Sequence, residues 1–222
     1  MNTTRKYQKL LVIFLCCFFV ITGCTNQQSS EPIITGRPDH NTISYQPIIP
    51  DPEPTIETNT YTNIQRSWLP PSAVEKSWTA IIIHHSATER GNAAIFDKDH
   101  REINGWDGIG YDFVIGNGTN SGDGQIEVTF RWKQQITGAH CKTDNNWANE
   151  DGIGICLVGH FNNYPPSARQ MQSLAELVRF LQKRYNIPTS RIYGHGTTPG
   201  ARVTDCPGHM FPMARLKSML GS

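Results

Sequence analysis

The stretch Trp78-Thr-Ala-Ile-Ile-Ile-His-His-Ser86 joins an apolar run to two consecutive histidines. A short apolar run of this length, bounded by polar residues, is typical of a buried β-strand. Because side chains alternate along a strand, His84 and His85 should point to opposite faces of the sheet. We therefore expect one histidine to face a site at the end of the strand and the other to pack or hydrogen-bond locally.

Other segments around this stretch have strand-like or helical patterns. Apolar runs of strand length cover residues 111–115, 126–130 and 153–158, with a shorter strand-like run at 191–194. Apolar residues at three- and four-residue steps indicate helices near 95–103, from a Ser167 cap to Tyr185, and from about 212 to 220. Strands that alternate with helices predict an α/β domain in which helices cover a central sheet.

The beginning of the chain has the pattern of an export signal. A positively charged start precedes an apolar run, residues 10–21, which as a helix would span only about 18 Å and so is too short for a bilayer. The following Ile21-Thr-Gly-Cys24 resembles the lipobox of bacterial lipoproteins. This resemblance implies removal of residues 1–23 and lipidation of Cys24. The alternative is an ordinary signal peptide in which this cysteine is incidental.

Residues 24–62 are rich in Pro, Thr, Ser, Asn and Gln and are predicted to be a flexible tether. Residues 63–222 are predicted to be a single folded domain. The net charge is +1 with 18% charged residues, which gives no basic face for nucleic acid. We expect an exported monomer, held to the membrane by the lipid on Cys24, in the outer membrane and periplasm if the cell has two membranes.

His195 and Cys206 stand at the two ends of a stretch rich in glycine, proline and threonine, which predicts a loop. A metal site, a cysteine nucleophile or half of a disulfide would each explain this arrangement. His84 or His85 could supply a second nitrogen, and two His with one Cys leave one tetrahedral zinc position open for water. As a nucleophile, Cys206 would lack a following backbone N–H for an oxyanion hole, because Pro207 has none.

Several motifs occur in a fixed order along the chain. They are Ile83-His-His-Ser-Ala-Thr88, Gly105-Trp-Asp-Gly-Ile-Gly-Tyr-Asp-Phe113, Gly138-Ala-His140, Ile153-Gly-Ile-Cys-Leu-Val-Gly159, Gly194-His195 and Thr204-Asp-Cys-Pro-Gly208. Together they resemble the zinc-dependent N-acetylmuramoyl-L-alanine amidases of type 2. That superfamily includes phage amidase lysozymes and the animal peptidoglycan-recognition proteins. The resemblance covers about residues 78–211.

The resemblance implies one catalytic domain with a central mixed β-sheet flanked by helices. It also implies a Zn²⁺ ion bound by His84, His195 and Cys206. The family's catalytic tyrosine falls on Tyr111, and its threonine or lysine near the last ligand falls on Thr204. The implied reaction is hydrolysis of the amide bond between N-acetylmuramic acid and L-alanine in peptidoglycan, by zinc-activated water.

Further residues are assigned by the same resemblance. His140, Asp112 and His85 are predicted to contact the substrate. The alternative for His140 is a structural hydrogen bond. Some family members carry an acid/base glutamate where this chain has Cys156, which places the chain with the tyrosine-bearing branch and leaves the proton-transfer group open. The retained Cys ligand favours an enzyme, and the alternative is a lipid-anchored receptor that binds peptidoglycan without cleaving it. We expect Cys141 and Cys156 to be free thiols, and the alternative is a disulfide between them.

Overall fold

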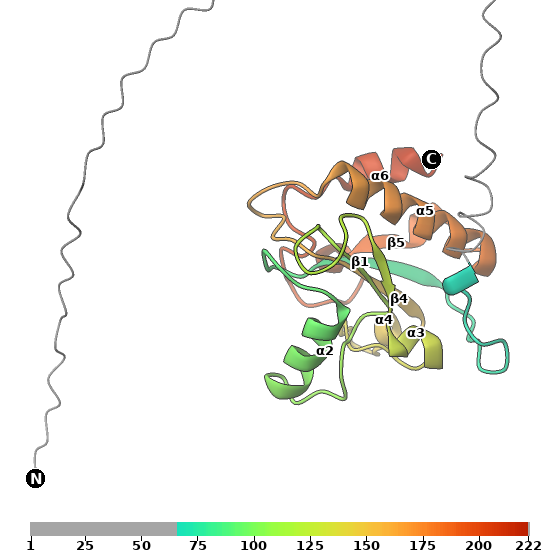
Figure 1. The fold of residues 1–222 in the computed structure, drawn as a ribbon. Coiled ribbons are helices and arrows are strands. Elements are labelled where there is room, and N and C mark those ends of the chain that lie inside the picture. Colours follow the sequence, from blue (N-terminus) through green and yellow to red (C-terminus); the bar gives the residue numbers. More distant parts are fainter. Residues whose placement is uncertain (1–65, 222) are drawn as a thin grey trace, which may run out of the picture. The chain divides into compact units, whose positions relative to one another are not determined.

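A five-stranded sheet lies at the centre of residues 66–221, the part of the chain that this computed structural model describes (Figure 1). The predicted export signal, Cys24 and the predicted tether lie outside these residues. Within residues 66–221, no helix combines the length and apolar character needed to cross a membrane.

The sheet is mixed, as the family resemblance implied. Its strands are β1 (Ala80–His85), β2 (Phe113–Ile115), β3 (Ile126–Val128), β4 (Gly152–Leu157) and β5 (Ile192–Gly194), in the spatial order β3-β2-β4-β1-β5. β1 pairs in parallel with β4 and β5, and β2 pairs in parallel with β4. β3 is antiparallel to β2 at the edge. The carboxyl ends of four strands therefore meet at one edge of the sheet.

Helices lie on both faces of the sheet. They are α2 (Ala93–Glu102), α3 (Phe130–Gln134), α4 (Trp147–Glu150), α5 (Ala168–Tyr185) and α6 (Met213–Met219), with short 3₁₀ turns η1 (Thr189–Arg191) and η2 (His195–Thr197). Figure 1 shows α5 and α6 on one side of the sheet and α2 on the other. The predicted α/β architecture is confirmed.

The long helix α5 begins and ends where the sequence predicts. The Ser167 hydroxyl accepts from the Gln170 N–H at 3.0 Å, and the Gln170 side chain accepts from the Ser167 N–H at 3.1 Å. This reciprocal capping box satisfies two of the free N–H groups at the start of the helix. Asn186 ends the helix in the left-handed conformation, at φ 54°.

Two predicted strands are too long. The run 111–115 is a strand only from Phe113. The run 126–130 is a strand only to Val128, because Thr129 takes the cap position of α3. The Thr129 hydroxyl donates to the Tyr111 carbonyl at 2.7 Å, and its N–H donates to the Asp112 carbonyl at 3.1 Å. These bonds turn the chain away from the sheet, and Phe130 becomes the first helical residue.

Alternation along β1 separates two cores. Ile81 and Ile83 belong to the larger buried cluster, which includes Leu174 of α5. Ala80 and Ile82 belong to a smaller cluster with Cys141 and Ala148. His84 continues the second series and His85 the first, so the two histidines face opposite sides of the sheet, as predicted.

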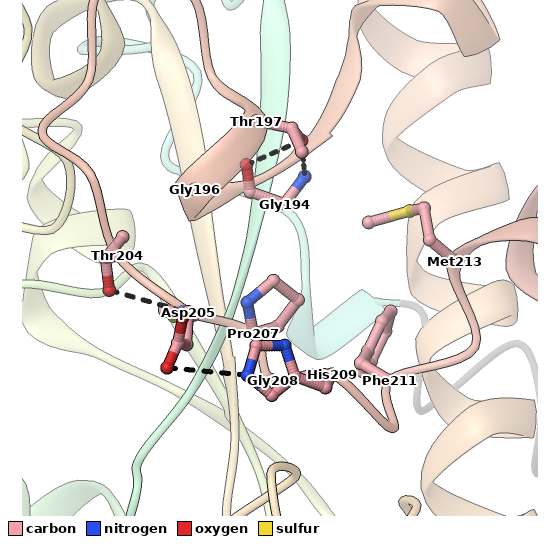
Figure 2. Close-up of a pocket in the computed structure, with 11 residues that line it drawn as sticks. Gly194, Gly196, Thr197, Thr204, Asp205, Pro207, Gly208, His209, Phe211 and Met213 are labelled. Carbon is pink, nitrogen blue, oxygen red and sulfur yellow. Dashed lines mark hydrogen bonds and ion pairs between the residues drawn. The ribbon is translucent and has the colours of Figure 1, made fainter.

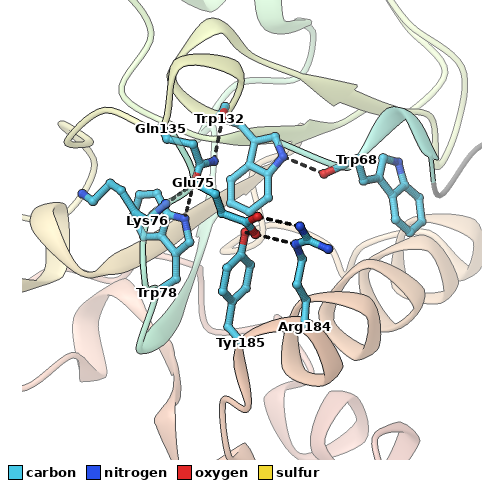
Figure 3. A network of polar contacts seen from close by, with 8 residues as sticks. All are labelled: Trp68, Glu75, Lys76, Trp78, Trp132, Gln135, Arg184 and Tyr185. Atoms are coloured by element: carbon cyan, nitrogen blue, oxygen red, sulfur yellow. Dashed lines mark hydrogen bonds and ion pairs between the residues drawn. The ribbon is translucent and has the colours of Figure 1, made fainter. Parts of the chain in front are cut away.

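The segment before β1 is fastened to the domain by polar contacts (Figure 3). The Trp132 indole N–H donates to the Trp68 carbonyl at 2.7 Å, and the Trp78 indole N–H donates to the Gln135 side chain at 2.8 Å. Glu75 binds Arg184 near the end of α5 through two bonds, at 2.5 and 2.6 Å. The domain therefore includes residues well upstream of its first strand.

Candidate metal centre

The three predicted zinc ligands meet at the carboxyl edge of the sheet. In the β1–β5 register Ile83 lies opposite Gly194, so His84 of β1 comes beside His195, the first residue after β5. One ligand atom from each of His84, His195 and Cys206 lies within 4.8 Å of the others. The His84 Nδ1 atom is 3.6 Å from the Cys206 sulfur. His195 and Cys206 follow His84 by 111 and 122 positions in the sequence, yet the three are neighbours in the fold.

The loop between His195 and Cys206 folds back on itself to bring its ends together. The Gly196 N–H donates to the Cys206 carbonyl at 2.7 Å. A Cβ atom on Gly196 would lie 2.2 Å from the Thr204 carbonyl oxygen, so this close approach requires glycine. The Thr204 hydroxyl accepts from the Cys206 N–H at 3.2 Å. The predicted loop therefore brings the His195 nitrogens and the Cys206 sulfur to the same place, where both could bind one metal ion.

The chemistry of these three groups fits a zinc ion. Burial lowers the pKa of His84 well below its usual value, and the neighbouring His140 and His195 lower it further. The neutral imidazole that results is the form that binds metals. Burial raises the pKa of Cys206 to about 12, against a smaller opposing effect of a His85 backbone hydrogen bond. A cation beside this sulfur would supply the charge that a thiolate needs, and two nitrogens with one sulfur are ligands that zinc accepts.

Tyr111 lies beside this group on the segment that leads into β2. Its ring centroid is 5.2 Å from that of His84. Burial, together with the nearby Cys156 and Cys206, raises the pKa of the Tyr111 phenol well above its usual value. Cys156 lies opposite His84 in the β1–β4 register, and burial raises the pKa of its thiol well above its usual value. Cys141 and Cys156 are both free thiols, as expected.

A cavity of about 490 Å³ opens beside the ligands. It is lined by Trp106, Ala139, His140, Lys142, Asn149, His195, Arg202, Val203 and Thr204. A second cavity of about 270 Å³ shares Thr204 with it and extends along Asp205, Pro207 and Phe211 (Figure 2). The larger cavity contains the predicted residues His140 and Thr204. It is the candidate substrate site.

Two of the three predicted substrate residues do not line this cavity. The Asp112 side chain is fully buried, and its carboxylate accepts from the Gly154 N–H at 2.8 Å. His85 accepts from the Phe161 N–H at 3.1 Å on the α5 side of the sheet. Because strand alternation and burial turn these side chains inward, the structure gives them local partners. The expectation that Asp112 reaches the substrate overlooked this burial.

Sequence reasoning missed several residues around the cavity. Trp106, Lys142 and Arg202 bring an aromatic ring and two cations to its wall. Asn149 of α4 accepts from the backbone N–H groups of His140 and Cys141, both at 2.8 Å. Their positions in the sequence could have pointed to them. Trp106 is inside one motif, Lys142 closely follows another, and Arg202 lies in the loop between two candidate ligands.

Comparisons with known proteins relate this chain to peptidoglycan amidases and peptidoglycan-recognition proteins. A family model described as N-acetylmuramoyl-L-alanine amidase matches residues 74–209. Peptidoglycan-recognition protein SC2 of Drosophila melanogaster is 30% identical over 139 residues, which cover 57% of this chain and 66% of that protein. The N-acetylmuramoyl-L-alanine amidase of Sus scrofa is 28% identical over 127 residues, 56% of this chain and 19% of that protein.

Solved structures show the same likeness. That of N-acetylmuramoyl-L-alanine amidase LysC from Clostridium intestinale has 30% sequence identity to this chain and a TM-score of 0.56. The match covers 65% of this chain and 86% of LysC. The family model, for its part, covers more than half of the chain. This chain therefore belongs to the N-acetylmuramoyl-L-alanine amidase family.

Proposed function

We propose that this chain is a zinc-dependent peptidoglycan amidase, which hydrolyses the bond between N-acetylmuramic acid and the L-alanine of the stem peptide. Membership of the family supports a protein that hydrolyses or binds peptidoglycan. The observation that favours hydrolysis is the complete set of His84, His195 and Cys206, which lie within 4.8 Å of one another beside an open cavity. A receptor that only binds has no need of this ligand set.

The ligand set would supply the main chemical step. Zinc held there would lower the pKa of a bound water to about 7 and polarise the carbonyl of the scissile amide. Trp106, Lys142 and Arg202 line the same cavity. The two cations suit the carboxylates of a stem peptide, and the aromatic ring offers a flat apolar surface to the substrate.

Thr204 is suited to bind the oxyanion. Its hydroxyl oxygen already accepts from the Cys206 N–H at 3.2 Å, which leaves the hydroxyl hydrogen free to donate into the cavity that Thr204 lines. A donor placed where negative charge develops stabilises the transition state. Tyr111, beside His84, would hydrogen-bond to the attacking water or the substrate.

Asp112 would position Tyr111 rather than touch the substrate. Its N–H donates to the Gly154 carbonyl at 2.9 Å, and its carboxylate accepts from the Gly154 N–H at 2.8 Å. This pair of bonds fixes the backbone next to Tyr111 against β4. The backbone from which the Tyr111 side chain extends is therefore held in place.

The test is digestion of purified peptidoglycan by the full chain, followed by mass spectrometry of the products. An amidase releases stem peptides with a free N-terminal L-alanine and leaves glycan strands without peptides. The activity should disappear on chelation and return with zinc. Binding of peptidoglycan without these products would contradict the proposal and favour the receptor.

Export and anchoring form a separate part of the proposal, which rests on the sequence of residues 1–24. Lipid on Cys24 would hold the enzyme at the membrane, and residues 24–62 would let the domain reach the cell wall. Mass spectrometry of the N-terminal peptide from the native host tests this directly. A mature chain without acyl groups on Cys24 would contradict it.

A further inference from the structure

The first ligand has a second ring nitrogen, and its partner is another histidine. While the Nδ1 atom of His84 lies 3.6 Å from the Cys206 sulfur, its Nε2 atom lies 3.1 Å from Nδ1 of His140. The Nε2 atom of His140 in turn lies 3.2 Å from the Gly152 carbonyl oxygen. A chain of two hydrogen bonds thus leads from the ligand to the backbone of β4.

The carbonyl at the end of this chain sets the direction of both bonds. A carbonyl oxygen can only accept, so Nε2 of His140 must carry the hydrogen. Within residues 66–221, no carboxylate is hydrogen-bonded to His140, and a buried, unpaired imidazolium would be costly. A neutral ring that is protonated at Nε2 accepts at Nδ1. His84 must then donate from Nε2, which leaves the lone pair of its Nδ1 atom directed toward Cys206.

We propose that His140 is a positioning residue for the metal site, which selects the tautomer of His84 and the orientation of its ring. This inference rests on the proposed function, because it supposes that His84 is a zinc ligand. Both ring nitrogens of His140 are occupied inside the protein. The residue can therefore offer a substrate in the cavity only the edge of its ring.

The surroundings of His140 hold its ring in one place. A Cβ atom on Gly154 would lie 2.5 Å from the His140 Cδ2 atom, and one on Gly138 would lie 2.6 Å from the same atom. Two glycines therefore make the slot that the ring fills. The His140 N–H donates to Asn149 at 2.8 Å, and the residue is only 8% exposed. A ring fixed on this many sides can act as a rigid acceptor for His84.

The test compares zinc affinities of the full chain and two variants by competition with a chromogenic chelator. His140→Phe keeps an aromatic ring but removes the acceptor, and we expect zinc affinity to fall about 10- to 100-fold. His140→Asn places an amide oxygen near the position of Nδ1, so it should retain most of the affinity. His209→Phe is the matched control, because His209 is an exposed histidine that bonds to none of the ligands.

A second measurement does not depend on zinc. Long-range ¹H–¹⁵N spectra of the metal-free wild-type chain report which ring nitrogen of each histidine carries hydrogen. We expect both His84 and His140 to be protonated at Nε2. Because this experiment uses the wild type, it remains decisive even if a His140 variant fails to fold.

Three results would overturn the inference. They are an Nδ1-protonated His84, equal zinc affinity in His140→Phe and the wild type, or His140→Asn as weak as His140→Phe. If the wild type binds no zinc, this inference and the proposed function fail together. If the wild type binds zinc with the expected tautomers but cleaves no peptidoglycan, the proposed function fails and the role of His140 stands.

Discussion

The two faces of the sheet use the same strands for different purposes. On the α5 side, Ile81 and Ile83 pack with Leu174 in a large apolar cluster. On the opposite side, the series that starts with Ala80 and Ile82 ends in His84, which lies with the other two candidate metal ligands, His195 and Cys206. The α5 face is almost entirely apolar core. On the opposite face, the buried apolar residue Ile82 is followed two positions later by the candidate metal ligand His84.

This difference shows how a small domain separates stability from function. The apolar face needs only volume and shape, so its residues are set by packing. The other face contains imidazole, thiol and carboxyl groups that are buried at a cost. Its stability depends on specific partners such as the Gly152 carbonyl and the Gly154 N–H. Substitutions on the two faces should therefore fail in different ways.

The largest effect on zinc binding and activity is expected from substitution of a candidate metal ligand. Cys206→Ser should abolish zinc binding and reduce amidase activity to background, because a hydroxyl is a much poorer zinc ligand than a thiolate. The fold should persist, since the core on the α5 side is untouched. Metal content by mass spectrometry and product analysis of digested peptidoglycan measure the two effects.

Cys141→Ser is the matched control, because Cys141 is a buried free thiol outside the ligand set. It should keep stoichiometric zinc. If both cysteine variants lost zinc equally, the assignment of Cys206 as the ligand would be wrong.

A substitution on the apolar face should have the reverse signature. Leu174→Ala removes a fully buried side chain from α5, and we expect the free energy of unfolding to fall by about 2–5 kcal/mol. Zinc affinity should stay near that of the wild type below the unfolding temperature. Urea unfolding and chelator competition on the same samples separate the two quantities. A weakened zinc site in the folded variant would show that the faces are coupled.

Much of the fold could be predicted from the sequence, because its main elements have strong local patterns. The face of α5 repeats over five turns, and its Ser167 cap is visible in the sequence. The helices α3 and α4 have five and four residues, too few for a periodic pattern to develop. The end of β3 was also missed, because Thr129 is fixed by bonds to a distant segment.

The site was predictable only in part, for a similar reason. Resemblance supplied His84, His195 and Cys206, and strand alternation separated His84 from His85. The partners of His140 could not be predicted, since the Gly152 carbonyl is placed by sheet register and not by local sequence. The same holds for Asp112, which appears in a functional motif but is turned into the interior.

Asp112, on the face of the sheet that carries His84, should make the stability of the fold depend on pH. Burial raises the pKa of its carboxyl to about 7, against the opposing effects of the Gly154 hydrogen bond, Arg131 and Lys76. Since its usual value is 3.8, the native state holds the proton more tightly than the unfolded state between these values. The contribution of this group to stability is therefore full below about pH 4 and is lost as pH rises through about 7.

Asp112→Asn removes this titration but keeps an oxygen that can accept from Gly154. Relative to the wild type, the variant should become more stable with rising pH, by about 1–3 kcal/mol between pH 4.5 and pH 8. Urea unfolding of both proteins across this range measures the difference, in which the shared titration of the buried histidines cancels. A difference that is constant with pH would mean that the carboxyl is not perturbed.

The smallest effect is expected at the ion pair of Glu75 and Arg184, on the α5 side of the molecule (Figure 3). The hydrogen bond from Arg184 is the main cause that lowers the pKa of Glu75, and Tyr185 adds a bond at 2.7 Å. Both charged side chains keep part of their surface in water, with 31% of Arg184 and 21% of Glu75 exposed, so solvent screens the pair. A double-mutant cycle with Glu75→Gln and Arg184→Gln should give about 0.2–1 kcal/mol, falling in high salt. A coupling energy well above this range and unchanged by salt would mean that polar contacts also stabilise the α5 side strongly. The difference between apolar packing on one face and polar partners on the other would then hold only for buried residues.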